Sequence, residues 1–253
     1  MAEQFVLRSE HLTKYFGAFC AVNDVTFGVE KGACEGIIGP NGAGKTTFFN
    51  LFTGLYKPTE GKITYLGEDI TDQTPEMRTV SGLVRTFQLV SVFDSLTILQ
   101  NMILSVTRFE KNYSNKWLFT MHNAEVDHLR LRAMEALHRV RLDDRSNDYA
   151  ANLSYGQKRK LEIAMAIAQN PTVLLLDEPL AGLSDYEIHE VISLIHEVKK
   201  DFTIVLIEHK ISHIQDLVSR LSVMSEGKIV AHGKPKDVIS DKEVRRIYWG
   251  VST

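Results

Sequence analysis

Short apolar runs, separated by Gly-rich turns or by amphipathic segments, recur along most of the 253-residue chain. Residues 170–232 alternate β-rich runs with amphipathic patterns, which predicts βα units around a mostly parallel sheet. Within this stretch, residues 173–176 and 204–207 are entirely apolar, as in strands that are buried on both faces. Residues 5–87 hold further short apolar runs, at positions 5–7, 25–29, 37–38 and 63–66. Both ends of the chain are therefore expected to be rich in strands.

The middle of the chain, residues 95–168, lacks clear strand signals. One set of apolar residues recurs there at helical spacing: Leu129, Ala133, Leu137 and Val140. A second helix is expected from Ser154 to about Ala168. Residues 109–123 are polar and aromatic without clean periodicity, which favours a long surface loop, and the sequence does not identify the role of the 106–123 loop. The middle region is therefore predicted to be a helical insertion in an α/β core.

Composition and charge narrow the class of protein. The chain is 44% hydrophobic and 24% charged, as in ordinary soluble globular proteins, and its net charge of −3 gives no electrostatic reason to expect nucleic acid as a partner. No apolar run approaches the roughly 18 residues that span a bilayer. Residues 1–4 lack the basic and apolar segments with which a signal peptide begins. Cys20 and Cys34 are too few for a disulfide framework. From these three observations together we expect a soluble, cytoplasmic protein.

The most informative motif spans residues 39–46, which match the phosphate-binding loop pattern G-x-x-x-x-G-K-[ST]. Its members are Gly39, Pro40, Asn41, Gly42, Ala43, Gly44, Lys45 and Thr46. The glycines let backbone N–H groups turn inward onto a phosphate, Lys45 can reach the outer phosphates, and the Thr46 hydroxyl can ligate Mg²⁺. An apolar strand precedes the loop, and a helix that starts with Thr46 and Thr47 would point its N-terminus at the anion. The alternative, a Gly-rich turn that matches by chance, is expected in roughly one per cent of chains of this size.

A second motif, Asp177 and Glu178, directly follows the apolar run 173–176. A buried strand would place both acids at its carboxyl end, where α/β sheets bind ligands. Asp177 suits a hold on Mg²⁺, and Glu178 suits the orientation and deprotonation of an attacking water. The alternative is a strand end with two solvated acids, which the phosphate-binding loop in the same chain disfavours.

The second expected helix opens with Leu153-Ser154-Tyr155-Gly156-Gln157. Ser154 and Gln157 have the spacing of a capping box, and a helix N-terminus with a Ser hydroxyl and a Gly backbone is also an anion site. This segment resembles the L-S-G-G-Q signature of the ABC (ATP-binding cassette) ATPases, which lies between a phosphate-binding loop and an acidic strand in this order. Tyr155 departs from that signature, whereas Ser154 and Gly156 keep the groups that would contact phosphate.

Other elements of the ABC ATPases follow in order along the chain. Gln88 resembles the glutamine that senses Mg²⁺ and the attacking water, and His209 resembles the switch histidine that contacts the γ-phosphate. Phe16 resembles the aromatic residue that stacks on adenine, with Tyr15 as the alternative, and residues 181–185 resemble the loop that crosses the dimer interface. The resemblance thus implies catalytic roles for Glu178, His209 and Gln88, metal ligation by Thr46, Gln88 and Asp177, and ATP contacts from Phe16, the loop 39–46, Thr47, Ser154, Gly156 and Gln157.

The resemblance covers nearly the whole chain, and its nearest variant is the ATP-binding subunit of branched-chain amino-acid importers and their urea and amide relatives. It rests on residues 84–88, 156–164 and 247–250 in particular. It implies an α/β fold with a P-loop (RecA-like) core, a mostly parallel sheet, an N-terminal antiparallel β region and an inserted helical subdomain. The expected bounds are 1–88 and 166–253 for the catalytic core and 89–165 for the helical subdomain.

The resemblance also implies an activity and partners. A Mg²⁺-dependent ATPase of this kind pairs with a second copy or with a paralogous subunit, and the pair encloses two ATP molecules. The pair would lie on the inner face of the cell membrane and drive permease subunits, and an importer would also use a periplasmic or extracellular solute-binding protein. Phe87, Val90, Val92 and Phe93 suit an apolar groove that receives a permease helix, with ordinary core packing as the alternative.

Other functions stay open at the level of sequence. The same motor could serve an exporter or a lipid-extraction complex. A soluble ABC protein that acts on DNA or ribosomes usually carries two cassettes or a long coiled coil, and neither is found here. A metabolite kinase with a phosphate-binding loop would need no signature helix. The sequence does not name the transported solute.

Overall fold

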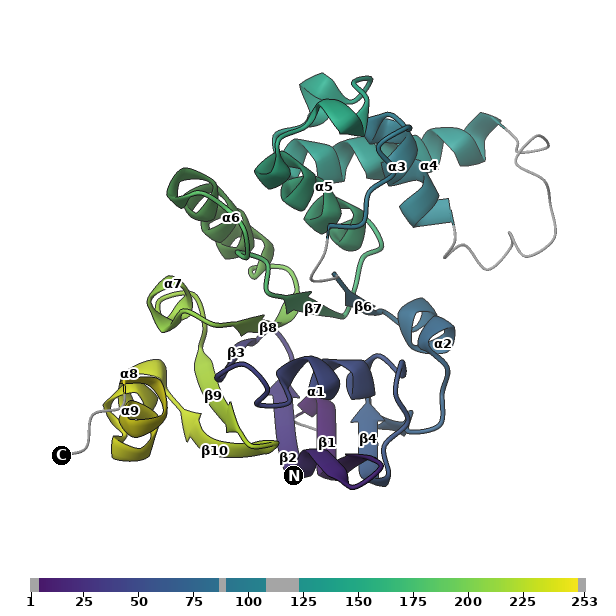
Figure 1. Cartoon of the computed structure of the whole chain (residues 1–253). Coiled ribbons are helices and arrows are strands. Elements are labelled where there is room, and N and C mark those ends of the chain that lie inside the picture. Colours follow the sequence, from purple (N-terminus) through teal and green to yellow (C-terminus); the bar gives the residue numbers. More distant parts are fainter. Residues whose placement is uncertain (1–4, 87–89, 108–122, 250–253) are drawn as a thin grey trace. The chain divides into compact units, whose positions relative to one another are not determined.

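The computed structural model of the chain describes residues 5–86, 90–107 and 123–249 (Figure 1). For residues 123–126 and 249 the backbone alone is described. Within these ranges, no helix is both long enough and apolar enough to cross a membrane. The loop predicted at 109–123 lies outside the described residues except for its last position, and Phe87 and Gln88 lie outside them as well.

Contacts between residues divide the chain into two compact units. The first unit comprises Met1–Arg85, Thr172–Pro179 and Ile195–Thr253, and the second comprises Thr86–Pro171 and Leu180–Leu194. The second unit therefore extends beyond the helical subdomain expected at 89–165, by a few residues at each end and by the separate segment Leu180–Leu194. The subdomain bounds given by the sequence stay a prediction.

The N-terminal part of the first unit is a four-stranded antiparallel sheet with the strand order β2-β1-β4-β5. Its strands are β1 (Phe5–Phe16), β2 (Phe19–Glu30), β4 (Glu60–Tyr65) and β5 (Glu68–Asp69). Strands β1 and β2 are joined by a tight turn at Gly17, whose φ of 60° is a conformation that glycine adopts without strain. The predicted N-terminal antiparallel region is thereby confirmed.

The first unit also contains a six-stranded sheet with the order β10-β9-β3-β8-β7-β6. Its strands are β3 (Cys34–Ile38), β6 (Leu83–Arg85), β7 (Val173–Asp177), β8 (Thr203–Glu208), β9 (Arg220–Ser225) and β10 (Lys228–Gly233). Neighbouring strands from β9 to β6 pair in parallel, and β10 runs antiparallel to β9. Every residue of β3, β7 and β8 is buried, and burial was predicted for the apolar runs that lie in β7 and β8. The carboxyl ends of these three adjacent strands meet at one edge, which brings together the residues that follow them.

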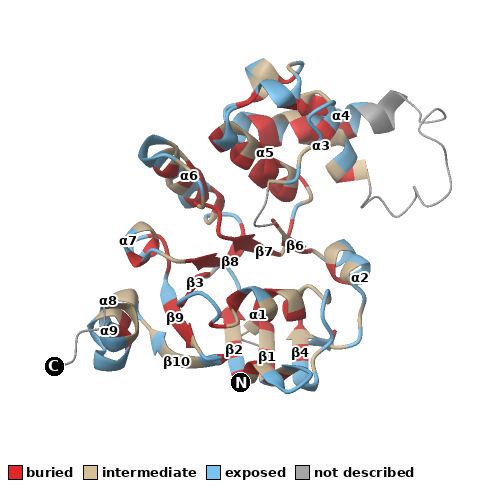
Figure 2. Ribbon diagram, viewed as in Figure 1, coloured by how far each residue is buried: buried red, intermediate tan, exposed pale blue. Residues whose placement is uncertain are grey.

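The core of the first unit is built around helix α1 (Lys45–Phe52). Its four apolar residues Phe48, Phe49, Leu51 and Phe52 are fully buried in one cluster with residues of both sheets (Figure 2). The rings of Phe48 and Phe52 lie 4.6 Å apart between centroids, and Phe48 meets the ring of Phe27 edge-on at 5.7 Å. Aromatic burial of this size fixes α1, and with it the loop at its N-terminus, against the sheets.

A buried arginine caps the C-terminal end of α1. Arg78, on helix α2 (Pro75–Val80), donates hydrogen bonds to the carbonyls of Leu51 at 2.7 Å and Phe52 at 2.8 Å. These carbonyls belong to the last turn of α1 and have no partners within the helix. Burial lowers the pKa of Arg78 to about 10, so the guanidinium stays charged at neutral pH and interacts favourably with the negative end of the helix.

The remaining helices of the first unit are α7 (Ile211–Ile214), α8 (Pro235–Ser240), α9 (Lys242–Trp249) and the last turn of α6 (Asp185–Val198). The second unit is helical in its described residues, with α3 (Ile98–Thr107), α4 (Asn123–Arg139), η3 (Asp143–Arg145), η4 (Ala150–Asn152), α5 (Tyr155–Ile167) and most of α6. The predicted apolar stripe is buried, because Leu129, Ala133, Leu137 and Val140 all lie in the interior. The prediction of a helical middle region is therefore correct for the described residues.

Candidate functional site

The loop 39–44 connects the carboxyl end of β3 to the N-terminus of α1, the strand–loop–helix context that the motif requires. Gly44 is the N-cap of α1 and has a φ of 98°. A Cβ at Gly39 would lie 2.3 Å from the carbonyl oxygen of Met224, and a Cβ at Gly44 would lie 2.3 Å from that of Ala21. Both glycines are therefore required by close backbone approach, and the backbone N–H groups at the start of α1 form an anion-binding end.

Lys45 occupies the inside of this loop. Its side chain is buried, with 5% of the residue exposed, and Nζ donates hydrogen bonds to the carbonyls of Gly39 at 2.8 Å and Pro40 at 3.0 Å. Burial lowers the pKa of Lys45, while the nearby carboxylates of Glu178 and Asp177 raise it. The ammonium group thus lies between the loop and the acids at the end of the sheet, where a phosphate would need a counter-charge.

Asp177 ends strand β7 and is completely buried. Its Oδ2 atom accepts a hydrogen bond from Arg85 at 2.6 Å, whereas the buried Oδ1 atom has no hydrogen-bond partner. Burial raises the pKa of Asp177, and the Arg85 charge opposes that shift. A buried carboxylate oxygen without a donor is an atom that a divalent cation or a cation-bound water can satisfy, so the site fits Mg²⁺.

Arg85 was not recognised from the sequence as a partner of Asp177. It lies on β6, the parallel neighbour of β7, and a second guanidinium nitrogen donates to Asn50 on α1 at 2.5 Å. The pair joins positions 92 residues apart. Strand order, which a single sequence does not reveal, was needed to find it.

Glu178 and His209 lie side by side at the carboxyl ends of β7 and β8. His209 Nε2 and Glu178 Oε1 are 2.7 Å apart, a short hydrogen bond, and the Glu178 residue is only 7% exposed. The backbone N–H of Glu178 donates to the carbonyl of Ile207 at 3.0 Å. The φ angle of Glu178 is 48°, in the left-handed region. A non-glycine residue adopts this conformation at a cost of roughly 1 kcal/mol, and such strain gathers at functional sites. The geometry brings together two residues that were each predicted to be catalytic.

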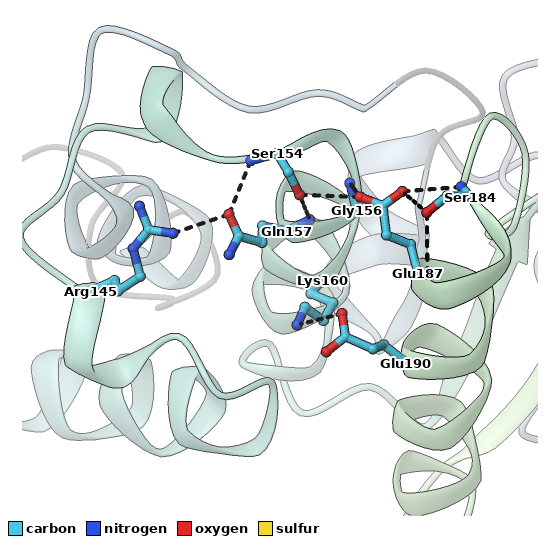
Figure 3. A network of polar contacts seen from close by, with 8 residues as sticks. All are labelled: Arg145, Ser154, Gly156, Gln157, Lys160, Ser184, Glu187 and Glu190. Atoms are coloured by element: carbon cyan, nitrogen blue, oxygen red, sulfur yellow. Dashed lines mark hydrogen bonds and ion pairs between the residues drawn. The ribbon is translucent and has the colours of Figure 1, made fainter.

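The segment 153–157 opens helix α5 with the predicted capping box. The backbone N–H of Gln157 donates to Ser154 Oγ at 3.2 Å, and the backbone N–H of Ser154 donates to Gln157 Oε1 at 3.0 Å (Figure 3). Gln157 also accepts a hydrogen bond from Arg145 at 3.1 Å. This end of α5 presents the Ser154 hydroxyl and the Gly156 N–H, and both donate to the carboxylate of Glu187, a contact that was not predicted from the sequence.

The other predicted site residues have simpler surroundings. Phe16 ends β1 and is 43% exposed, and its ring meets that of Tyr56 edge-on at 5.2 Å. Tyr15, the alternative, is equally exposed. Thr46 is exposed and Thr47 is partly buried in the first turn of α1. Gln88 lies outside the described residues, so its predicted role stays a prediction.

Phe93 is the best described member of the predicted apolar groove. Its side chain is 58% exposed, while Asn101 fixes its backbone by accepting from the Phe93 N–H at 2.8 Å and donating to the Phe93 carbonyl at 3.1 Å. Val90 and Val92 are partly buried. Core packing, the alternative raised from the sequence, therefore does not apply to Phe93.

Comparison with known proteins identifies the class. Residues 22–181 match the protein family described as ABC transporter. The high-affinity branched-chain amino acid transport ATP-binding protein LivG of Salmonella typhimurium is 36% identical over 252 residues, 98% of each chain. The probable branched-chain amino acid transport ATP-binding protein LivG of Archaeoglobus fulgidus is 33% identical over 97% of this chain and 95% of its own. The solved ADP conformation of MJ1267, an ATP-binding cassette of an ABC transporter, is 34% identical and matches with a TM-score of 0.85 over 98% of this chain and 99% of its own.

The chain therefore belongs to the ABC transporter family, as the motifs indicated. Within that family it is an ATP-hydrolysing nucleotide-binding subunit, and its α/β fold is that of the ABC ATPase cassettes.

Proposed function

We propose that this subunit powers the uptake of branched-chain amino acids, or of a related small polar solute, through a membrane permease. The support comes from two sources. Relatives that match nearly the full chain are named as branched-chain amino acid transport ATP-binding proteins. The residues that would bind and hydrolyse ATP are present in this chain. Among the observations, the short Glu178–His209 hydrogen bond is the main support for a catalytic role of Glu178.

In this proposal Glu178 is the general base. It lies at the carboxyl end of β7, near Lys45, and its carboxylate would accept a proton from the water that attacks the γ-phosphate. His209 would hold that carboxylate in place with a hydrogen bond donated by Nε2 to Oε1. Lys45 and the N–H groups of the loop would bind the outer phosphates. Phe16 or Tyr15 would stack on the adenine.

Mg²⁺ would be held by the Thr46 hydroxyl and by the Oδ1 side of Asp177, with Gln88 as a further ligand. When bound, it would supply positive charge that neutralises the charge developing on the phosphates during hydrolysis. The Arg85 charge favours the ionised form of Asp177, and its hydrogen bond holds Oδ2, which leaves the opposite oxygen for the cation or its water.

The working form would be a dimer on the cytoplasmic face of the membrane. A relative of known structure, the ATP-binding cassette MJ0796 bound to ADP and Pi, is described as dimeric, and it matches this chain with 25% identity and a TM-score of 0.76. In a dimer of two copies, or of this chain with a paralogue, residues Ser154, Gly156 and Gln157 would face the nucleotide on the phosphate-binding loop of the other subunit. Residues 89–165 would form the helical subdomain that contacts the permease, and a solute-binding protein outside the membrane would deliver the solute.

The experiment that tests the proposed function is reconstitution. Permease subunits that co-purify with this chain would be placed with it in proteoliposomes, together with the solute-binding protein, and tested for ATP-driven uptake of labelled leucine, urea and amides. We expect uptake of one of these solutes that stops when Glu178 is replaced by Gln. ATP-driven movement in the opposite direction, or hydrolysis without uptake of any of these solutes, would contradict the proposal.

A further inference from the structure

Glu187 places its carboxylate between the N-termini of two helices (Figure 3). Its Oε2 atom accepts hydrogen bonds from the backbone N–H of Ser184 at 3.1 Å and from its hydroxyl at 2.8 Å, which caps Glu187's own helix, α6. Its Oε1 atom accepts from the Ser154 hydroxyl at 3.2 Å and from the Gly156 N–H at 3.0 Å, at the start of α5. One side chain thus serves two helix ends through two separate oxygens.

Those hydrogen bonds use the donors that the proposed function assigns to the γ-phosphate. A hydroxyl and a backbone N–H each have one hydrogen to donate. The Ser154 hydroxyl donates its single hydrogen to Glu187, and its oxygen accepts from the Gln157 N–H. Gly156 N–H and the Ser154 hydroxyl therefore cannot make full hydrogen bonds to a phosphate oxygen while they are bound to Glu187.

Steric contact leads to the same conclusion. A Cβ built on Gly156 would lie 2.5 Å from Oε1 of Glu187 and 2.6 Å from its Cδ. The carboxylate thus lies directly against the Gly156 backbone. The same space cannot also hold a phosphate oxygen, and two anions at one helix end would repel each other.

The carboxylate is ionised when it makes these contacts. Hydrogen bonds from Ser184, followed by those from Gly156 and Ser154, hold the pKa of Glu187 below its usual value. An ionised carboxylate at the positive end of α5 resembles the ligand that this end is expected to bind.

We propose that Glu187 is an internal, displaceable anion that occupies the phosphate donors of the signature segment until the γ-phosphate on a partner subunit replaces it. The inference rests on the proposed function, because it needs a partner's nucleotide. Glu187 would then be a positioning residue that keeps Ser154 and Gly156 aligned in the free subunit and raises the ATP concentration needed for dimer closure.

Phosphate can displace the Glu187 carboxylate from α5 only if the second unit stays folded without the Oε1 hydrogen bonds. When Oε1 leaves α5, the Oε2 bonds to Ser184 can remain and keep the N-terminus of α6 capped. A second link between the same helices, from Lys160 Nζ to Glu190 Oε2 at 3.4 Å, lies one turn further along and does not involve the signature donors. The structure thus provides both a retained anchor and a matched control.

The test uses the full chain with Glu178→Gln, which is expected to bind ATP without hydrolysing it. Sedimentation velocity would measure the ATP concentration at half-maximal dimer formation, with and without Glu187→Gln. Glutamine keeps the shape and still suits a capping box, but it removes the charge from the competing group. We expect the added substitution to lower that ATP concentration by about fivefold, because a charge-assisted hydrogen bond is roughly twice as strong as a neutral one. Glu190→Gln in the same background should change it by less than about twofold, as expected for loss of a partly exposed ion pair.

Each other outcome has a definite meaning. If the Glu178→Gln parent forms no dimer at saturating ATP, neither with a second copy nor with a paralogous subunit, the proposed function fails. If the parent dimerises but Glu187→Gln needs the same or more ATP, the carboxylate does not compete with phosphate and the inference is overturned. The inference is likewise overturned if Glu187→Gln does not fold by circular dichroism, or if Glu190→Gln gives the same shift, because the carboxylate would then be a structural link.

Discussion

Arg85 donates a 2.6 Å hydrogen bond to Asp177, and the two side chains are 6% and 0% exposed. A buried ion pair is strongly destabilised when one partner is removed, because the other charge is left without compensation. Here the arginine also bonds Asn50 on α1, so it connects the helix of the phosphate-binding loop to the acidic end of β7.

We therefore expect Arg85→Ala to lower the free energy of unfolding by about 3–5 kcal/mol. Urea denaturation of the isolated subunit would measure the change. Arg8→Ala is the matched control, because Arg8 forms a 3.0 Å ion pair with Glu10 that is partly exposed and should contribute less than about 1 kcal/mol. Equal effects of the two substitutions would show that the buried pair does not hold the site together.

Glu35 should make stability depend on pH. It lies buried on β3, where burial raises the pKa of its carboxyl from 4.5 to about 7, Arg220 on β9 opposes the shift and Glu30 adds to it. Because the folded state binds the proton more tightly than the unfolded chain, stability is full below about pH 4.5 and falls as the pH rises to about 7. At about 1.4 kcal/mol per pKa unit, the stability lost is roughly 3 kcal/mol.

Glu35→Gln should remove this part of the pH dependence and make the protein more stable at pH 8. Thermal or urea unfolding between pH 5 and pH 8 would measure it, with Glu10→Gln on the exposed surface as the control. A wild-type stability that rises steadily across this range, with no difference in Glu35→Gln, would mean that the carboxyl is not protonated in the fold.

Phe93→Ala should spare the basal ATPase of the isolated subunit but reduce assembly with, or transport through, the permease. Its exposed ring and its backbone, fixed by Asn101, suit a contact surface better than a core position. Co-purification with the permease would measure assembly. Leu131→Ala, at another exposed apolar position on α4, is the control and should assemble normally. Normal transport by a folded Phe93→Ala variant would show that Phe93 is an exposed residue that does not contact the permease.

Sites shared between two subunits can be tested by mixing. Lys45→Ala should weaken ATP binding and stop turnover together, since the ammonium contributes to both. Ser154→Arg should bind ATP as a monomer but fail to hydrolyse it, because the cation would lie in the dimer interface. A mixed dimer has one site with both defects and one with neither, so we expect partial recovery of ATPase activity on mixing. Demonstrated mixed dimers without recovery would argue against independent shared sites.

The local features of the fold could be predicted from the sequence, and the long-range contacts could not. The phosphate-binding loop, the buried strands β7 and β8 and the capping box of α5 each depend on neighbouring residues, so their patterns are visible in the chain. The Arg85–Asp177 pair depends on strand order, which the sequence does not show. The left-handed φ of Glu178 could not be predicted either, because glutamate has no preference for that backbone conformation.

The contact from Glu187 to the signature segment could be predicted only in part. The spacing of Ser184 and Glu187 is a capping-box pattern, which could have marked Glu187 as a residue that turns back toward a helix end. Which second helix it would reach, 31 residues away at Gly156, required the structure.

In the proposed mechanism Glu178, held by His209, is the base for ATP hydrolysis. The most direct measurement is single-turnover hydrolysis by Glu178→Gln, alongside ATP affinity by titration. Glutamine keeps the size of the side chain but cannot accept the proton, so we expect ATP affinity close to that of the wild type and hydrolysis at least ~100-fold slower. Hydrolysis at the wild-type rate by a folded, ATP-binding variant would contradict the account.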